Sequence, residues 1–261
     1  MPHDSQHPAP SPLHVPLRMP GGTLLTRLKV YDSPGPDGQP GGTPHVHLVC
    51  TELYYVSSGS GAVEILDRNG FARIELNSHA ALLFTAGTIH RLINTSGDLE
   101  ILIVMQNSGL PEHGDNIATF PGEVLADPSR FATAMKAETL SDALRRRDRG
   151  VEGFLELKQS FEQSLDEGRK ALDEFYKLCL QRTKSHHQEW YARVTNGAFQ
   201  DAQDSLHKVI AASTGKIDYL HCAGNELLPP VDCDHVGFCG QLGRYFDSAT
   251  LAMDGQKVGR S

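Results

Sequence analysis

The sequence predicts a mainly β N-terminal half, folded as a jelly-roll barrel of about eight antiparallel strands, and an α-helical C-terminal half. Two observations support this division. Between residues 22 and 108, short runs rich in branched and aromatic side chains alternate with turns that contain glycine, proline or asparagine. After residue 120, apolar residues recur every three or four positions, which is the spacing of an amphipathic helix.

Residues 1–21 precede the barrel and are rich in proline and histidine. Six of the first 20 residues are proline and three are histidine, with few large apolar side chains between them. Such a segment buries too little apolar surface to offset the entropy lost on ordering. We therefore expect a disordered arm.

The predicted barrel spans residues 22–108. Its expected strands are residues 23–31, 44–50, 52–57, 61–67, 71–76, 80–84, 88–94 and 99–106. Asn69 and Gly70, between the fourth and fifth runs, form a pair that is typical of a hairpin turn. Alternate side chains of each strand are expected to point into the barrel.

Residues 109–261 are expected to form a helical extension that ends in an irregular segment from residue 216. Asp127 and Pro128 are suited to the N-cap and first position of a helix. One continuous apolar stripe then predicts a long helix; it consists of Phe154, Leu157, Phe161, Leu165, Gly168, Leu172, Phe175 and Cys179. A second stripe runs from Phe199 to Ile210 and ends near Gly215, which resembles a C-cap.

Charge and composition exclude several classes of partner. The chain has 24 Lys and Arg against 32 Asp and Glu, a net charge of −8, which disfavours nucleic acid and anionic membrane surfaces. The N-terminal residues lack the basic and apolar regions of a secretory signal. Five scattered cysteines are an odd number, which favours reduced thiols. We therefore expect a cytoplasmic protein with a small-molecule substrate.

Three histidines and one glutamate within the predicted barrel have the spacing of a metal site. His45 and His47 are two positions apart on one strand, so their side chains share a face. Glu52 follows at the start of the next strand, and His90 lies inside another. Imidazole and carboxylate ligands together suit one divalent first-row transition metal (Fe, Mn, Ni, Cu or Zn). Its remaining coordination positions would be left to water, substrate or dioxygen.

The same residues resemble the first motif of the cupin superfamily, G-x5-H-x-H-x4-E-x6-G. His45, His47, Glu52 and Gly59 match it, whereas Gln39 stands where the motif begins with glycine. The resemblance covers residues 22–107 and implies a cupin barrel with a metal centre. Because cupins commonly associate through their sheets, it also implies a homodimer.

The second cupin motif, G-x5-P-x-G-x2-H-x3-N, is met at Gly87, His90 and Asn94. Thr85 replaces its proline and His79 replaces its first glycine. These departures fall on turns and not on ligands, so they concern the geometry of the loops.

Strand alternation outward from the ligands predicts a substrate pocket. Its expected lining is Thr43, Val49, Val56, Leu92 and Asn94. Tyr54 shares the face of Glu52, and its phenol near a metal would donate a hydrogen bond to substrate or act as an acid; the alternative is a core aromatic residue. Tyr54 and Glu52 are therefore the candidate catalytic residues, Glu52 as both ligand and proton relay.

Two groups outside the barrel have competing interpretations. The basic run 145–149 is by default a solvated helix face, or else a site for a phosphorylated substrate or partner if it folds over the barrel mouth. Cys222, Cys233, His235 and Cys239 lie close in sequence and are either a second metal site or small side chains buried under a loop.

Three functions fit these observations. The first is a metal-dependent oxidoreductase of the dioxygenase type, which we favour. The second is a metal-dependent sugar or sugar-phosphate isomerase or epimerase, because residues 52–65 also resemble that branch of the cupins. The third is a non-catalytic small-molecule sensor.

The helical half has two expected roles. It mediates a homodimer, or it covers the barrel mouth. In the second case residues 216–246 would complete the pocket through Tyr219, His221, His235 and Arg244.

Overall fold

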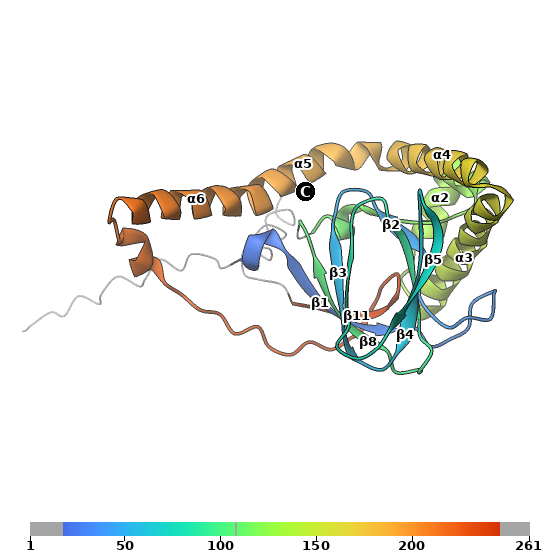
Figure 1. Ribbon diagram of the computed structural model, residues 1–261, viewed down its shortest axis with the longest axis horizontal. Coiled ribbons are helices and arrows are strands. Elements are labelled where there is room, and N and C mark those ends of the chain that lie inside the picture. Colours follow the sequence, from blue (N-terminus) through green and yellow to red (C-terminus); the bar gives the residue numbers. More distant parts are fainter. Residues whose placement is uncertain (1–17, 108, 246–261) are drawn as a thin grey trace, which may run out of the picture.

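Within residues 18–107 and 109–245, which the computed structural model describes, two antiparallel sheets face each other and form the predicted jelly-roll barrel (Figure 1). One sheet has the strand order β10-β11-β1-β8-β3-β6, and the other has the order β5-β4-β7-β2-β9. The predicted arm of residues 1–21 lies almost wholly outside the described residues, which begin at residue 18.

The eight strands expected from the sequence are all present. They are β1 (Leu24–Val30), β2 (His45–His47), β3 (Glu52–Ser58), β4 (Gly61–Asp67), β5 (Gly70–Leu76), β6 (Ala81–Phe84), β7 (Ile89–Ile93) and β8 (Glu100–Met105). The predicted hairpin joins β4 to β5, with Asp67 paired to Gly70.

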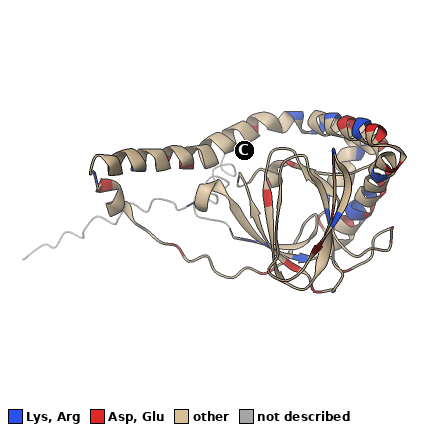
Figure 2. Ribbon diagram, in the orientation of Figure 1, with Lys and Arg blue, Asp and Glu red and all other residues tan. Residues whose placement is uncertain are grey.

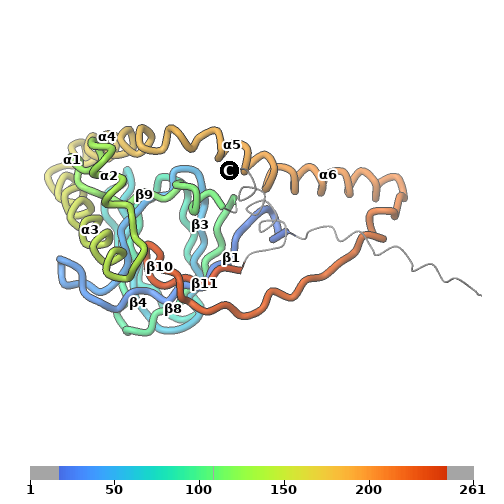
Figure 3. Tube along the Cα trace, turned by 180° about the vertical axis from the view of Figure 1, so that it is seen from behind, coloured from blue at the N-terminus to red at the C-terminus, as the bar shows by residue number. Residues whose placement is uncertain are grey.

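Three further strands come from beyond residue 108. They are β9 (Asn116–Ala118), β10 (His235–Val236) and β11 (Gly240–Tyr245). Figure 3 shows the chain returning from the far end of the molecule to the barrel, where β11 pairs with β1. A Cβ atom at Gly240 would lie 1.9 Å from the carbonyl oxygen of Lys29, so this pairing requires glycine. The predicted irregular segment therefore completes the sheet, although its glycines give a weak strand signal.

The helices follow the barrel in the chain; α3 and α4 lie against one side of it, whereas α6 extends away from it and buries no residue (Figure 1). They are α1 (Gly122–Ala126), α2 (Pro128–Met135), α3 (Leu140–Gln163), α4 (Leu165–Thr183), α5 (His187–Val194) and α6 (Gln200–Ser213). Short helical turns are η1 (Pro20–Gly22), η2 (Pro111–His113), η3 (Lys184–His186), η4 (Thr195–Phe199) and η5 (Asp218–Cys222). Charged residues of both signs are concentrated on α3 and α4 (Figure 2). Among the described residues, no helix combines the length and apolar character that crossing a bilayer requires.

The apolar stripe predicted as one helix belongs to two. Ser164 separates α3 from α4 with extended backbone angles, and its side chain accepts a hydrogen bond from the backbone N–H of Glu167. Serine is among the best N-cap residues, so it ends one helix and starts the next without changing the apolar spacing. The helix start predicted at Asp127 is confirmed, since its side chain accepts from the N–H groups of Ser129 and Arg130.

Two apolar clusters hold the layers together. The cluster between the sheets includes Leu28, Val56, Val63, Leu92 and Ile101. The other joins the five-stranded sheet to the helices, and its members include Val46, Leu66, Ile89, Phe154, Leu172 and Phe175. The first predicted stripe is therefore buried against the barrel wall. The second stripe is not, because Phe199, Leu206 and Val209 are more than half exposed.

Two buried arginines anchor the loop of residues 31–44 in front of β2. Arg91 is fully buried and makes a two-pronged contact with Asp37, at 2.6 and 3.0 Å. Arg147, also buried, donates to the carbonyl oxygens of Ser33 and Pro34 at 2.7 and 3.0 Å. Since this loop leads directly into His45, its anchoring positions the first residue of the site.

Substituting Asp37→Asn is expected to lower the free energy of unfolding by about 2 kcal/mol, because it leaves the buried Arg91 guanidinium without its closest carboxylate. Burial opposes ionisation, but Arg91 outweighs it and holds the pKa of Asp37 below its ordinary value. The unaltered protein should therefore lose stability as the pH falls below about 4.

Urea unfolding at neutral and acid pH checks this expectation. Asp98→Asn, at an exposed position, serves as the control and should change stability by less than about 0.5 kcal/mol. An equal effect of the two substitutions would contradict the role of Asp37.

Candidate metal centre

Three strands bring the four predicted ligands to one point inside the barrel. β2 and β7 pair so that His45 lies opposite His90, and His47 follows on the same face of β2. Glu52 is the first residue of β3. All four side chains are buried, and each offers one ligand atom that lies within 4.8 Å of the others. The ligand set predicted from the two motifs is thus assembled in space.

Each imidazole is oriented through its Nδ1 atom. The Nδ1–H of His45 donates to the carbonyl oxygen of Thr43 (2.9 Å), and that of His90 donates to Thr88 (3.0 Å). Nδ1 of His47 lies 3.3 Å from a carboxylate oxygen of Asp115. These contacts leave the Nε2 atoms as the ligands, in the manner of metal-binding histidines whose other nitrogen is held by an oxygen.

Three of the converging atoms are buried without a hydrogen bond among the described residues: Nε2 of His47, Nε2 of His90 and Oε2 of Glu52. The carboxylate oxygen is 3.0 Å from His90 Nε2 and 3.5 Å from His47 Nε2. Buried polar atoms without partners cost free energy, whereas a cation at their centre would satisfy all three. The donor set therefore fits a divalent transition metal.

Asp115 supports this arrangement from the far side of His47. Its fully buried carboxylate accepts backbone N–H bonds from Leu48, Val49 and Cys50, at 3.1, 2.8 and 3.2 Å. The same side chain thus fixes the β2–β3 connection and the ring of His47. Sequence reasoning missed it, because a lone aspartate in the irregular segment 108–122 follows no motif.

Electrostatics favour the metal-binding protonation states of His45 and Glu52, whereas they favour the protonated form of His47. Burial, with the neighbouring His90 and His47, holds the pKa of His45 well below its ordinary value, so its imidazole is neutral. Burial acts against ionisation of Glu52 as well, but His47 and His90 outweigh it and lower the pKa of Glu52. For His47, the carboxylates of Glu52 and Asp115 overcome burial and raise the pKa.

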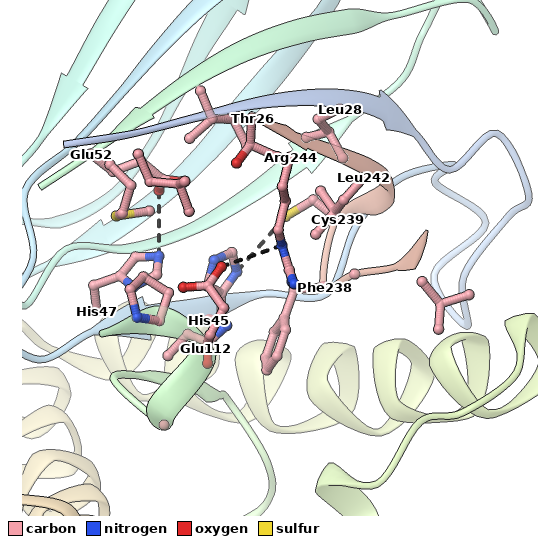
Figure 4. Close-up of a pocket in the computed structure, with 18 of the residues that line it drawn as sticks. Thr26, Leu28, His45, His47, Glu52, Glu112, Phe238, Cys239, Leu242 and Arg244 are labelled. Atoms are coloured by element: carbon pink, nitrogen blue, oxygen red, sulfur yellow. Dashed lines mark hydrogen bonds and ion pairs between the residues drawn. The ribbon is translucent and has the colours of Figure 1, made fainter. Parts of the chain in front are cut away.

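A cavity of about 310 Å³ adjoins the ligands (Figure 4). It is lined by Leu24, Thr26, Leu28, His45, His47, Glu52, Tyr54, Ile103, Met105, Pro111, Glu112, Gly114, Asn116, Met135, Arg146, Val236, Gly237, Phe238, Cys239, Leu242 and Arg244. This volume lies at the small end of the range for ligand pockets.

Tyr54 reaches the cavity as predicted. It is almost fully buried, and its phenol interacts with Glu52 and with the thiol of Cys239. Burial, followed by the negative charge of Glu52, raises the pKa of Tyr54 well above its ordinary value. The phenol therefore keeps its proton at neutral pH and is able to donate a hydrogen bond.

The five residues predicted as pocket lining lie elsewhere. Val49 is 41% exposed, whereas Val56 and Leu92 pack in the core between the sheets. The Asn94 side chain donates to the Val30 carbonyl and accepts from Gly97 and Leu99, so it closes a turn. Thr43 is buried and contributes its carbonyl to His45. Alternation correctly gives the buried face for Val56 and Leu92, but not the depth along the barrel at which the cavity opens. It fails for Val49, because β2 ends at His47.

Residues from the helical half complete the cavity instead. Arg146 comes from α3, and Phe238, Cys239 and Arg244 come from the returning hairpin. Of the candidates from residues 216–246, only Arg244 lines the cavity within the described residues; Tyr219, His221 and His235 do not.

The C-terminal cysteines and histidine do not meet. Cys222 and His235 are exposed, and the thiol of Cys233 contacts the Arg27 carbonyl at 3.6 Å. Cys239 lies in the cavity wall, 3.9 Å from Nδ1 of His45. Across residues 18–107 and 109–245, the only grouping suited to a metal is the one formed by His45, His47, Glu52 and His90.

No family model matches the sequence, and no curated protein does. Among solved structures, PAC13 from Streptomyces with uridine is 13% identical, covering 34% of this chain and 62% of its own, with a TM-score of 0.25. WlaRA, a TDP-fucose-3,4-ketoisomerase from Campylobacter jejuni, is 20% identical over 31% of this chain and 58% of its own (TM-score 0.27). A Klebsiella pneumoniae protein with a double-stranded beta-helix domain is 16% identical over 38% and 81% (TM-score 0.27). The chain thus spans less than two thirds of the length of the first two, and at such low TM-scores its function has to be inferred from its own geometry.

Replacing His90→Ala is expected to abolish stoichiometric metal binding, because one ligand and the backbone anchor of its ring are lost together. Elemental analysis of tag-free protein checks this. His235→Ala removes an exposed histidine and should keep the full metal content. Retention of one ion per chain by His90→Ala would contradict the ligand assignment.

Replacing Asp115→Asn is expected to weaken metal affinity by about tenfold, since the charge that orients His47 disappears while the four ligands remain. Competition with a chelator measures the affinity, and thermal melting shows whether the fold is retained. An unchanged metal affinity in a folded variant would show that Asp115 stabilises the β2–β3 connection and has no effect on metal binding.

Proposed function

We propose that the protein binds one divalent first-row transition metal through His45, His47, Glu52 and His90 and is a metal-dependent oxidoreductase of the dioxygenase type. The observation that carries this proposal is the placement of buried, unsatisfied ligand atoms in the wall of a cavity large enough for a small molecule. The metal would be Fe, Mn, Ni, Cu or Zn, and a redox-active ion serves the favoured reaction.

A metal with this ligand set would supply a Lewis acid and, with open coordination positions, a place to bring substrate and dioxygen together. The protein's own side chains do the rest. Glu52 supplies one negative charge against the cation, and Tyr54 keeps a proton on its phenol beside that carboxylate. Tyr54 would therefore donate a hydrogen bond to an oxygen atom of the substrate.

The apolar wall supports a reaction shielded from water. Five apolar side chains line the cavity beside the polar residues: Leu24, Leu28, Ile103, Met105 and Leu242. Such surfaces accommodate the carbon skeleton of an organic substrate and lower the local dielectric, which strengthens every charge interaction in the site.

The ionisable groups of the cavity favour oxidation over isomerisation. Proton abstraction needs a base, such as a free carboxylate or imidazole, whose pKa lies near the working pH. Glu112 is paired with Arg244 at 3.3 Å, and burial raises the pKa values of Tyr54 and Cys239. Outside the metal ligands, the described residues thus offer no unpaired carboxylate or imidazole in the cavity wall. We therefore favour oxidation at the metal over an isomerisation that relies on a protein base.

Oxygen consumption tests the proposal. Protein loaded separately with each metal is offered enediols, flavonoids, thiols and keto acids, and at least one combination should consume oxygen. Uptake with none would contradict the dioxygenase; proton exchange on a sugar phosphate would then support an isomerase, and saturable binding without turnover would support a sensor.

Tyr54→Phe is expected to lower kcat by about a hundredfold while metal content stays the same, because only the hydroxyl that faces the substrate is lost. Tyr55→Phe provides a matched control, since Tyr55 is partly exposed and its hydroxyl bonds to His79 on the outside of the barrel. Equal activity of the two variants would remove Tyr54 from the mechanism.

A further inference from the structure

Arg146 occupies an unusual position for an arginine from a charged helix face. In the run 145–149, which the sequence suggests is solvated, Arg145 has a side chain 69% exposed, whereas Arg146 is only 7% exposed. α3 crosses the barrel so that Arg146 reaches the wall of the cavity that also holds the metal ligands. The helix therefore contributes a buried cation to the site.

The contacts of Arg146 place it close to the centre. Its guanidinium lies 4.1 Å from the centre of the Phe238 ring, and that ring lies 5.1 Å from the ring of His45. Nη2 donates to the Gly237 carbonyl at 2.6 Å, and Nη1 makes a long contact of 3.4 Å with Met135. Nε is buried with no hydrogen bond in the described chain. Arg146 thus has an N–H group that is free to donate a hydrogen bond. The Phe238 ring lies between its guanidinium and the metal ligand His45.

The charge of Arg146 has no counterpart in the described residues. Arg91, Arg147 and Arg244 are each paired with a carboxylate, whereas no Asp or Glu lies within ion-pair distance of Arg146. Burial is the main influence on its pKa, which is lowered. A buried charge is stable only when another charge or a set of hydrogen bonds compensates it. Two backbone carbonyls and the Phe238 ring compensate part of this charge, and an anion in the cavity would compensate the rest.

We propose that Arg146 binds a single carboxylate group of the substrate, so that the molecule presented to the metal is an organic monoacid. Glu112 already neutralises Arg244, so Arg146 is the arginine of the cavity wall whose charge is left for the ligand to match. Arginine donates to a carboxylate through two N–H groups in a fixed geometry, which would orient the substrate as well as attract it. This assignment rests on the proposed function in one respect: the bound acid is taken to be a substrate of the metal centre.

Matched acids and amides test the charge requirement. Benzoate, 2-furoate, hexanoate and 4-oxopentanoate are each compared with the primary amide of the same skeleton, using the full chain and calorimetric titration or thermal shift. At least one acid should bind about tenfold more tightly than its amide. Acids that bind no better than their amides, or no binding by any acid, would overturn the proposal. So would tighter binding of inorganic phosphate than of every acid.

Variants of the run identify the residue responsible. Arg146→Gln should abolish the preference for acid over amide, and Arg146→Lys should retain part of it, since the charge remains but the fork does not. Arg145→Gln, one position away and exposed, should behave as the unaltered protein. A preference that survives in Arg146→Gln would transfer the anion site to another group and refute this assignment.

Parallel measurements separate this inference from the metal proposal. Each variant is assayed for bound metal and for thermal melting, and acid binding is measured with and without metal. Arg146→Gln should keep its metal and its cooperative melt. If the unaltered protein binds no metal but still prefers acids through Arg146, the proposed function fails and the anion site stands. If it binds metal but shows no preference for acids, only the anion site is refuted.

Discussion

Buried ligand atoms without hydrogen bonds are the constraint on which the rest of this structure depends. Three ligand atoms converge in the barrel interior, where an unsatisfied polar atom is costly: Nε2 of His47, Nε2 of His90 and Oε2 of Glu52. The surrounding contacts maintain that convergence. Backbone carbonyls hold two of the imidazoles, Asp115 holds the third, and β2 and β7 pair with His45 directly opposite His90.

The barrel alone does not make the cavity. Its wall includes Arg146 from α3 and Phe238, Cys239 and Arg244 from the hairpin that returns to pair with β1. The expectation that the C-terminal half covers the barrel mouth therefore has structural support in these four residues. The homodimer and the cytoplasmic location remain predictions.

The sequence predicted the parts of the site that depend on local spacing. The four ligands lie on or next to strands that can be recognised from short alternating runs and the turn residues between them, so their convergence could be inferred. These ligands are His45, His47, Glu52 and His90. Asp115 could not be inferred in this way, because it acts on residues far away in the chain. The basic run 145–149 is recognisable as a possible cover of the barrel mouth, but which of its arginines is buried depends on the packing of α3 and not on local spacing. The same reason explains Ser164, whose capping bond breaks a helix without disturbing the apolar spacing, and Gly240, whose strand is set by its approach to Lys29.

X-ray absorption spectroscopy of the metal-loaded protein tests the central claim most directly, because it reads the atoms bound to the ion. The account predicts a first shell of three imidazole nitrogens and carboxylate oxygen, at about 2.0 to 2.2 Å if the ion is zinc, with no sulfur. A sulfur neighbour at about 2.3 Å, or a shell without imidazole scattering, would contradict it, because the ion would then be bound by a set of ligands other than these four side chains.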